Sequence, residues 1–254
     1  MLKSSRIVMA FSIGTLVFSF ATYAPGQAST DPQVQAVAKA LDKKQFKEVH
    51  AEVNNGVVKL TGSVPLYSNK EDADHRVHRV KGVAAVDNEI QVSGSEVDDA
   101  TLTKKLAEKL EYDRVGYGTT AFNSITVASH HGTVTLGGTA YGPIDKDSAV
   151  SLVANYPGVK DVVDEINVDP VSPFDDQIRV AEYRTIYGFA TLNKYAIDPG
   201  KPIRITVVNG NVTLTGVVDS QADKDTANIR ANSVSGVFKV INLLQVANDR
   251  SSGK

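Results

Sequence analysis

Apolar and polar residues alternate along pairs of adjacent segments in this chain, and the pattern occurs three times. The plainest occurrence has apolar residues at every second position on both sides of an Asn-Gly turn at 209–210: Ile203, Ile205, Val207, Val212 and Leu214. This is a strong signal of a β-hairpin, because both central residues of a type I′ turn need positive φ. The same hairpin is expected at 49–60 around Asn54-Asn55-Gly56 and, in the second occurrence, around His131-Gly132. Histidine tolerates positive φ better than most residues, so we assign His130 and His131 to turn chemistry.

Each hairpin is followed by a segment with the helical spacing of apolar residues, and a further helical segment precedes the first hairpin at 33–44. The helix after the hairpin presents a core-facing stripe at i, i+4 and i+7: Ala73, Val77 and Val80, then Ala149, Val153 and Tyr156, then Ala227, Ala231 and Val234. We expect a capping box from Ser68 to Glu71 to start the first of these helices, and Ser220 with Asp223 to start the last.

A short apolar strand follows each second helix, as at Val86, Ile90 and Val92. The order in each copy is therefore helix, strand, strand, helix, strand. This order predicts an α+β fold with a three-stranded sheet packed on two helices. Because the last strand arrives through a helical crossover, the sheet should be mixed.

Two glycines separated by twenty residues mark every copy. The pairs are Gly62 and Gly82, Gly138 and Gly158, and Gly216 and Gly236. They recur after 76 and then 78 residues, which fits an array of globular modules better than a solenoid. The second glycine of each pair is expected to end a helix in left-handed geometry, so all six are interpreted as structural residues.

The repeat predicts three tandem small domains at 31–95, 96–169 and 174–248, with a flexible tail at 249–254. Residues 1–28 indicate a cleaved signal peptide, because Lys3 and Arg6 precede an apolar run at 7–21 and Gly26-Gln27-Ala28 offers small residues for cleavage. An uncleaved anchor is the alternative, but about fifteen residues fall short of the roughly twenty that a spanning helix needs. We expect a periplasmic or secreted protein with no membrane span after cleavage.

Charge is shared unevenly between the copies. Lys and Arg against Asp and Glu number nine to nine in 31–95, six to twelve in 96–170 and ten to eight in 171–254. A net-acidic chain is not drawn as a whole to nucleic acid or to an anionic bilayer, so any such binding must be local. The chain has no cysteine, which excludes disulfides, thiol catalysis, cysteine metal sites and a lipoprotein attachment site.

The second helix of the first copy carries a basic side that is a candidate site for an anionic head group: His75, Arg76, His78, Arg79 and Lys81. His75 and His78 could in principle hold a divalent ion, with Asp72 and Asp74 beside them. No third ligand follows from the spacing, so we favour a solvated basic face and expect no metal site.

A second candidate is the stretch at the front of the third copy that contains Tyr183, Arg184 and Tyr187. Aromatic and cationic side chains together suit a bilayer interface or a partner groove. The alternative, which we favour, is that these aromatics cover the sheet of the third domain and fill its junction with the second.

No segment carries the signature of a catalytic or cofactor site. GxSxG, HExxH and Walker sequences are absent. Gly116-Tyr117-Gly118 lacks the preceding strand, the following helix and the third glycine of a dinucleotide loop. We therefore expect no enzyme activity and no cofactor.

Taken together, the copies resemble BON domains, the bacterial OsmY and nodulation modules. The resemblance rests on the glycine-ended strand, the second glycine with its following valine, and the segments Asn88-Glu89-Ile90 and Asp164-Glu165-Ile166. Copy two departs from the pattern at Gly137 and at Tyr141-Gly142-Pro143. The resemblance implies a non-enzymatic envelope protein that binds envelope proteins or components such as anionic phospholipids in envelope maintenance or osmotic-stress protection. Its alternative implication is a periplasmic chaperone that acts on client proteins.

Overall fold

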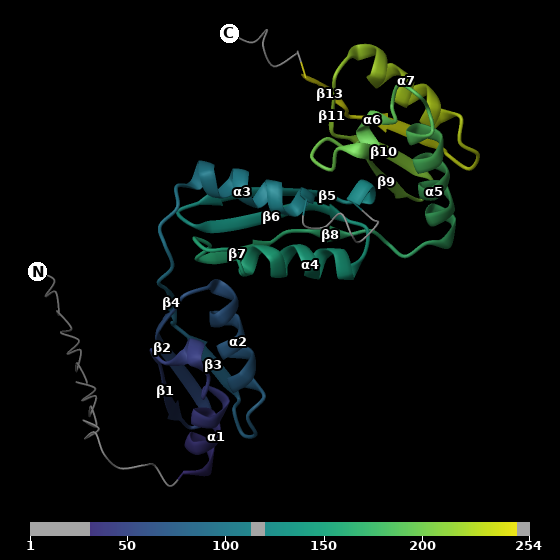
Figure 1. The fold of residues 1–254 in the computed structure, drawn as a ribbon. Helices are drawn as coiled ribbons and strands as arrows, with labels where there is room; N and C mark the ends of the chain where they lie inside the picture. Colours follow the sequence, from purple (N-terminus) through teal and green to yellow (C-terminus); the bar gives the residue numbers. More distant parts are fainter. Residues whose placement is uncertain (1–30, 113–119, 248–254) are drawn as a thin grey trace, which may run out of the picture.

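A computed structural model describes residues 31–112 and 120–247, and it contains three consecutive copies of one α+β unit (Figure 1). In each copy a small sheet packs against two helices, as the sequence predicts. The predicted signal peptide at 1–28, the predicted tail at 249–254 and the Gly116-Tyr117-Gly118 segment lie outside the described residues.

The first copy contains α1 (Pro32–Ala40), a 3₁₀ turn η1 (Lys44–Phe46), β1 (Val49–Asn54), β2 (Val57–Val64), α2 (Tyr67–His78), β3 (Ala85–Asn88) and β4 (Gln91–Val92). Its first helix is shorter than the expected 33–44, because the chain leaves the helix after Ala40 and turns Phe46 into the core, where this ring is 3 % exposed.

The other two copies repeat this order with longer first helices. The second has α3 (Asp99–Tyr112), η3 (Thr120–Phe122), β5 (Ser124–His130), β6 (Thr133–Ala140), α4 (Pro143–Ala154), β7 (Asp161–Asp164) and β8 (Asn167–Val168). The third has α5 (Pro173–Tyr187), α6 (Lys194–Ile197), β9 (Arg204–Val208), β10 (Asn211–Thr215), β11 (Val217–Val218), α7 (Gln221–Asn232), β12 (Lys239–Asn242) and β13 (Gln245–Val246).

The sheet of each copy is mixed, which confirms the prediction from the helical crossover. In the first copy β1 and β2 pair antiparallel and β2 pairs parallel with β3, so the first strand lies at a sheet edge. The same order places β5 and β9 at the edges of the other two sheets. The final strand differs from the single strand expected, because it is divided into two short segments that both pair with the second strand or its continuation.

The predicted turns and core stripes are confirmed. The first turn residues Asn55, His131 and Asn209 all have positive φ, and a glycine with positive φ follows each of them. The central positions of the stripes are buried in three separate hydrophobic clusters, one for each copy. Asp99 and Asp175, in the first turns of α3 and α5, accept hydrogen bonds from the backbone N–H groups of their own hairpin turns. A first-turn carboxylate therefore ties the first helix to the hairpin in copies two and three.

Two details of the helix ends differ from expectation. Ser68 does not cap α2, because the helix already begins at Tyr67, its N-cap position is Leu66 and no side chain caps it. Ser220 does cap α7, by accepting a hydrogen bond from the N–H of Asp223. Gly82 has a φ of 90°, as predicted, but it lies beyond the end of α2 because bonds from Val80 and Val83 continue the chain through a further turn.

Glycine is required at the first repeat position for two reasons: φ is positive there, and the backbone of the neighbouring strand comes too close for a side chain. Gly62 has a φ of 102°, and a Cβ placed there would overlap the carbonyl oxygen of Glu48 on the neighbouring strand. The corresponding atom at Gly138 would overlap the carbonyl oxygen of Ser124. A side chain at either position would push the first two strands apart. Contrary to the prediction from the sequence, the strand does not end at this glycine, because β2 continues to Val64 and β6 to Ala140.

Candidate functional site

The basic side of the first copy lies at the C-terminal end of α2, where cations are favourable for the helix dipole. The positive charge of Arg76 already has partners, because its Nε is 2.8 Å from Asp72 Oδ2 and its guanidinium lies 5.9 Å from the centroid of the Phe46 ring. His75, His78, Arg79 and Lys81 are exposed. The ion pairs of the described residues leave Arg79 and Lys81 without a carboxylate partner, so this end of α2 presents unmatched positive charge.

The cluster is confined to the first copy. At the repeat positions of Arg79 and Lys81 the second copy has Asn155 and Pro157, and the third has Ser233 and Ser235. A position that serves only the fold would carry similar residues in all three copies. The basic end of α2, defined here as His75, His78, Arg79 and Lys81, is thus a feature of one copy and not of the domain.

The aromatic front of the third copy divides into a buried and an exposed part. Tyr187 is 4 % exposed and donates its hydroxyl hydrogen to the carbonyl oxygen of Ile203, so it belongs to the core. Tyr183 is 41 % exposed and packs edge-on against Tyr187, with a centroid distance of 4.7 Å. Tyr183 also approaches Phe122 of copy two at 6.1 Å. Of the three candidate residues, Tyr183 and Arg184 reach the surface, while Tyr187 fills the third core.

A buried ionic cluster joins α5 to the second copy, and sequence reasoning missed it. The Arg179 guanidinium, 2 % exposed, lies 2.9 Å from Asp169 Oδ2 and 2.6 Å from Asp176 Oδ1, and donates to the carbonyl oxygen of Val207. The ring of Tyr141 in copy two lies 5.2 Å from this guanidinium. Burial raises the pKa of Asp169, and the adjacent guanidinium opposes that rise. The cluster holds two copies together and leaves no free cation for a ligand.

Glu182, one turn further along α5, is fully buried. Neither carboxylate oxygen has a hydrogen-bond partner, and burial raises the pKa of this group to about 8. Because the buried side of α5 also contains Asp175 and Arg179, the sequence gives no apolar stripe in which Glu182 would stand out from the surface residues.

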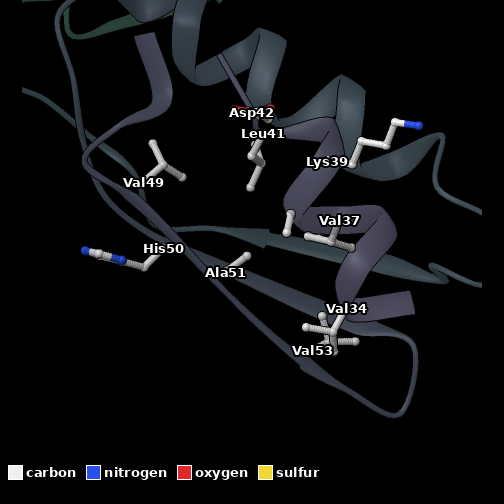
Figure 2. Close-up of a pocket in the computed structure, with 10 residues that line it drawn as sticks. Val34, Val37, Lys39, Leu41, Asp42, Val49, His50, Ala51 and Val53 are labelled. Carbon is white, nitrogen blue, oxygen red and sulfur yellow. The ribbon is translucent and has the colours of Figure 1, made fainter. Parts of the chain in front are cut away.

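A groove with both polar and apolar lining residues lies between α1 and β1 of the first copy and has a volume of about 640 Å³ (Figure 2). Val34, Val37 and Leu41 line it from the helix side, and β1 supplies its inward-facing residues: Val49, Ala51 and Val53. Figure 2 shows the His50 side chain pointing away from the helix, toward the outside of the sheet edge. We call this feature the α1–β1 groove.

Neither a metal site nor a membrane-spanning element is found in the described part of the chain. Within residues 31–112 and 120–247, the His, Asp and Glu side chains form no group of three or more that could hold a metal ion. No helix in the same ranges combines the length and apolarity needed to cross a bilayer.

Comparison with known proteins identifies relatives for each copy. The model of the BON domain matches residues 30–94, 98–170 and 190–248. The osmotically-inducible protein Y of Escherichia coli is 26% identical over 190 residues, which cover 74% of this chain and 92% of that protein. The outer membrane lipoprotein DolP of Haemophilus influenzae is 28% identical over 165 residues, covering 64% of this chain and 81% of that protein. A solved structure of CdsD, a structural protein of the type III secretion system of Chlamydia trachomatis, matches with a TM-score of 0.25 and 18% identity, covering 86% of this chain and 94% of that one.

Proposed function

The chain belongs to the BON-domain family, and from that membership we propose that it is a non-enzymatic periplasmic protein of envelope maintenance or osmotic-stress protection that binds anionic phospholipid through its first copy. The relatives support the coarser part of this proposal, since one is named for osmotic induction and the other for the outer membrane. The observation that carries the finer part is the basic end of α2, where Arg79 and Lys81 are exposed and unpaired in a net-acidic chain.

The expected affinity is modest and depends on salt. Each basic side chain near an anionic surface contributes about 1 kcal/mol, so Arg79 and Lys81 together supply about 2 kcal/mol. Because the cluster is exposed, salt near physiological strength should screen much of this attraction.

Flotation with vesicles tests the proposal. We expect the wild type to float with vesicles of phosphatidylglycerol and phosphatidylcholine at low salt, and not with phosphatidylcholine alone. The double variant Arg79→Glu and Lys81→Glu should remain in solution. A matched control is Lys201→Glu with Lys239→Glu, which changes the net charge equally at exposed lysines of the third copy. If the Arg79 and Lys81 variant floats as well as the wild type, the assignment to α2 is refuted.

A second candidate function rests on strand β12, the outer edge of the third sheet. Ile241 within this strand and the residues next to its two ends, Phe238 and Leu243, are 37 %, 79 % and 57 % exposed. The corresponding residues of the first copy are small or acidic: Ala84, Asp87 and Glu89. An exposed sheet edge with apolar side chains can pair with an extended peptide, which is what a chaperone for client proteins requires.

Aggregation assays with an unfolded client separate the two functions. We expect Phe238→Ser with Leu243→Ser to abolish suppression of aggregation if β12 binds clients, and Ile229→Ser to serve as control, since Ile229 is 67 % exposed on α7 of the same copy. A wild type that floats with no vesicle at any salt, but suppresses aggregation, would replace the lipid proposal with this one.

A further inference from the structure

The first strand of each copy lies at a sheet edge, next to the first helix of the same copy. These edge strands are β1, β5 and β9, and their flanking helices are α1, α3 and α5. An edge strand presents unpaired backbone N–H and C=O groups, and with a groove beside it this edge is a natural site for association with another protein. Three copies in one chain therefore bring three such edges.

Copies two and three close their edges against each other. Arg204, the first residue of β9, lines the groove between α3 and β5. Its Nη1 donates to the carbonyl oxygen of Asn123 at 2.8 Å, and its Nη2 lies 3.6 Å from Glu111 Oε1. The groove of copy two is thus occupied by a side chain from the first strand of copy three.

The contact is reciprocal. Ala121 and Phe122, which precede β5, pack on the hydrophobic cluster of copy three. The hydroxyl groups of Ser124 and Thr215 lie 3.2 Å apart across the same boundary. Each copy therefore covers the first-strand edge of the other, in the manner of an interface between two like subunits.

The edge of the first copy has no such cover among the described residues. Its α1–β1 groove measures about 640 Å³, against about 260 Å³ for the groove of copy two that Arg204 enters. Pairing of two edges within the chain leaves the third open.

We propose that a second copy of this chain occupies the α1–β1 groove, so that the protein forms a twofold dimer through its first copies. His50 holds the repeat position of Arg204 and is exposed at the edge of β1. In the dimer, His50 of the partner subunit enters the groove as Arg204 enters that of copy two. Lys39 and Asp42, which line this groove, carry opposite charges, and in a twofold interface any contact of residue i with residue j is matched by a contact of j with i. The balanced charge of residues 31–95 adds no net repulsion between two first copies.

Sedimentation of the purified protein tests the dimer. Ala38 is exposed on α1 and lines the groove, so Ala38→Arg should obstruct it without disturbing the core. Ala36 is exposed on the same helix outside the groove, and Ala36→Arg is the matched control. We expect the wild type and Ala36→Arg to be dimers and Ala38→Arg to be a monomer, with all three giving the same circular dichroism spectrum. His50→Arg, which reproduces the residue of copy three, should dimerise at least as tightly as the wild type.

Several results would overturn the proposal. If the wild type sediments as a monomer at every concentration, the dimer is refuted and the groove is left to a partner of other chemistry. Ala38→Arg that dimerises like the wild type would place the interface elsewhere, and weaker dimerisation of His50→Arg would contradict the equivalence with Arg204.

Discussion

Replacement of the buried carboxyl of α5, Glu182→Gln, should remove a pH dependence from the stability of the third copy. Glu182 is fully buried, has no hydrogen-bond partner for either oxygen and has a pKa raised by burial from 4.5 to about 8. A raised carboxyl pKa means that the folded protein binds the proton more tightly than the unfolded chain. The resulting stabilisation is complete below about pH 4.5 and is lost as the pH rises through about 8.

The size of this effect follows from the pKa. A change from 4.5 to about 8 corresponds to about 5 kcal/mol, at about 1.36 kcal/mol per pKa unit. Water entry and local opening of the helix relieve part of that penalty, so we expect a loss of about 2 to 4 kcal/mol for the wild type between pH 5 and pH 9. Glutamine cannot ionise and is close in shape to the protonated acid. The variant should therefore lose about 2 to 4 kcal/mol less than the wild type over this pH range.

Denaturant titration followed by circular dichroism at pH 5 and pH 9 measures the difference, and hydrogen exchange of α5 assigns it to the third copy. Glu165→Gln, at an exposed position of copy two, removes the same charge from the surface and is the control. Equal pH dependence in the wild type and Glu182→Gln would show that the carboxyl is solvated or paired in solution, and would refute the reasoning from burial.

Three further substitutions test the repeat and the junction. Gly82→Ala should lower the free energy of unfolding by about 1 kcal/mol through its positive φ alone. Gly62→Ala should lower it by more than about 3 kcal/mol, because the new Cβ overlaps the carbonyl oxygen of Glu48. Equal midpoints of thermal unfolding for the two variants would contradict this order. Arg204→Ala should lower the free energy of unfolding by about 2 kcal/mol and increase hydrogen exchange in β5 and β9, because it leaves the half-buried Glu111 without its cation. Unchanged exchange would show that the groove contact does not hold copies two and three together.

The parts of the fold that sequence predicted are those set by local pattern. The turn at Asn209 and Gly210, the stripe through Ala227 and Ala231, and the cap at Ser220 each depend on residues close together in the chain, and all are present. Local pattern failed where a packing requirement overrides it. Ser68 has a capping sequence, yet α2 begins one residue earlier and the Ser68 hydroxyl is buried without a partner.

From the sequence, aromatic residues of the third copy are expected at its junction with the second, and Tyr183 approaches Phe122 there, but the polar contacts between copies could not be predicted. Arg179 was one of several cations in an aromatic stretch, and nothing in its neighbours indicates that it contacts Asp169 and Val207 in a buried junction. The groove beside β1 gave no signal either, because the apolar residues of α1 satisfy the same periodicity whether a helix packs tightly or leaves space. The repeat alignment shows that His50 and Arg204 occupy equivalent positions. Only the structure shows that Arg204 contacts the groove of another copy, whereas His50 makes no such contact among the described residues.

The way copies two and three pair determines which surfaces the chain can offer. The contacts of Arg204 and Phe122 cover the first-strand edges of these two copies. A ligand or partner that needs such an edge must therefore bind the first copy. The last strands β3, β7 and β12 form the opposite edges of the three sheets, and only in the third copy are the Phe238 and Leu243 positions apolar, although β7 exposes Val163. The open first-strand edge and the basic end of α2 thus lie in the first copy, and the last-strand edge with exposed Phe238 and Leu243 lies in the third. A variant that blocks the α1–β1 groove should therefore leave client binding at β12 unchanged, and a coupled loss of both would show that the terminal copies do not act independently.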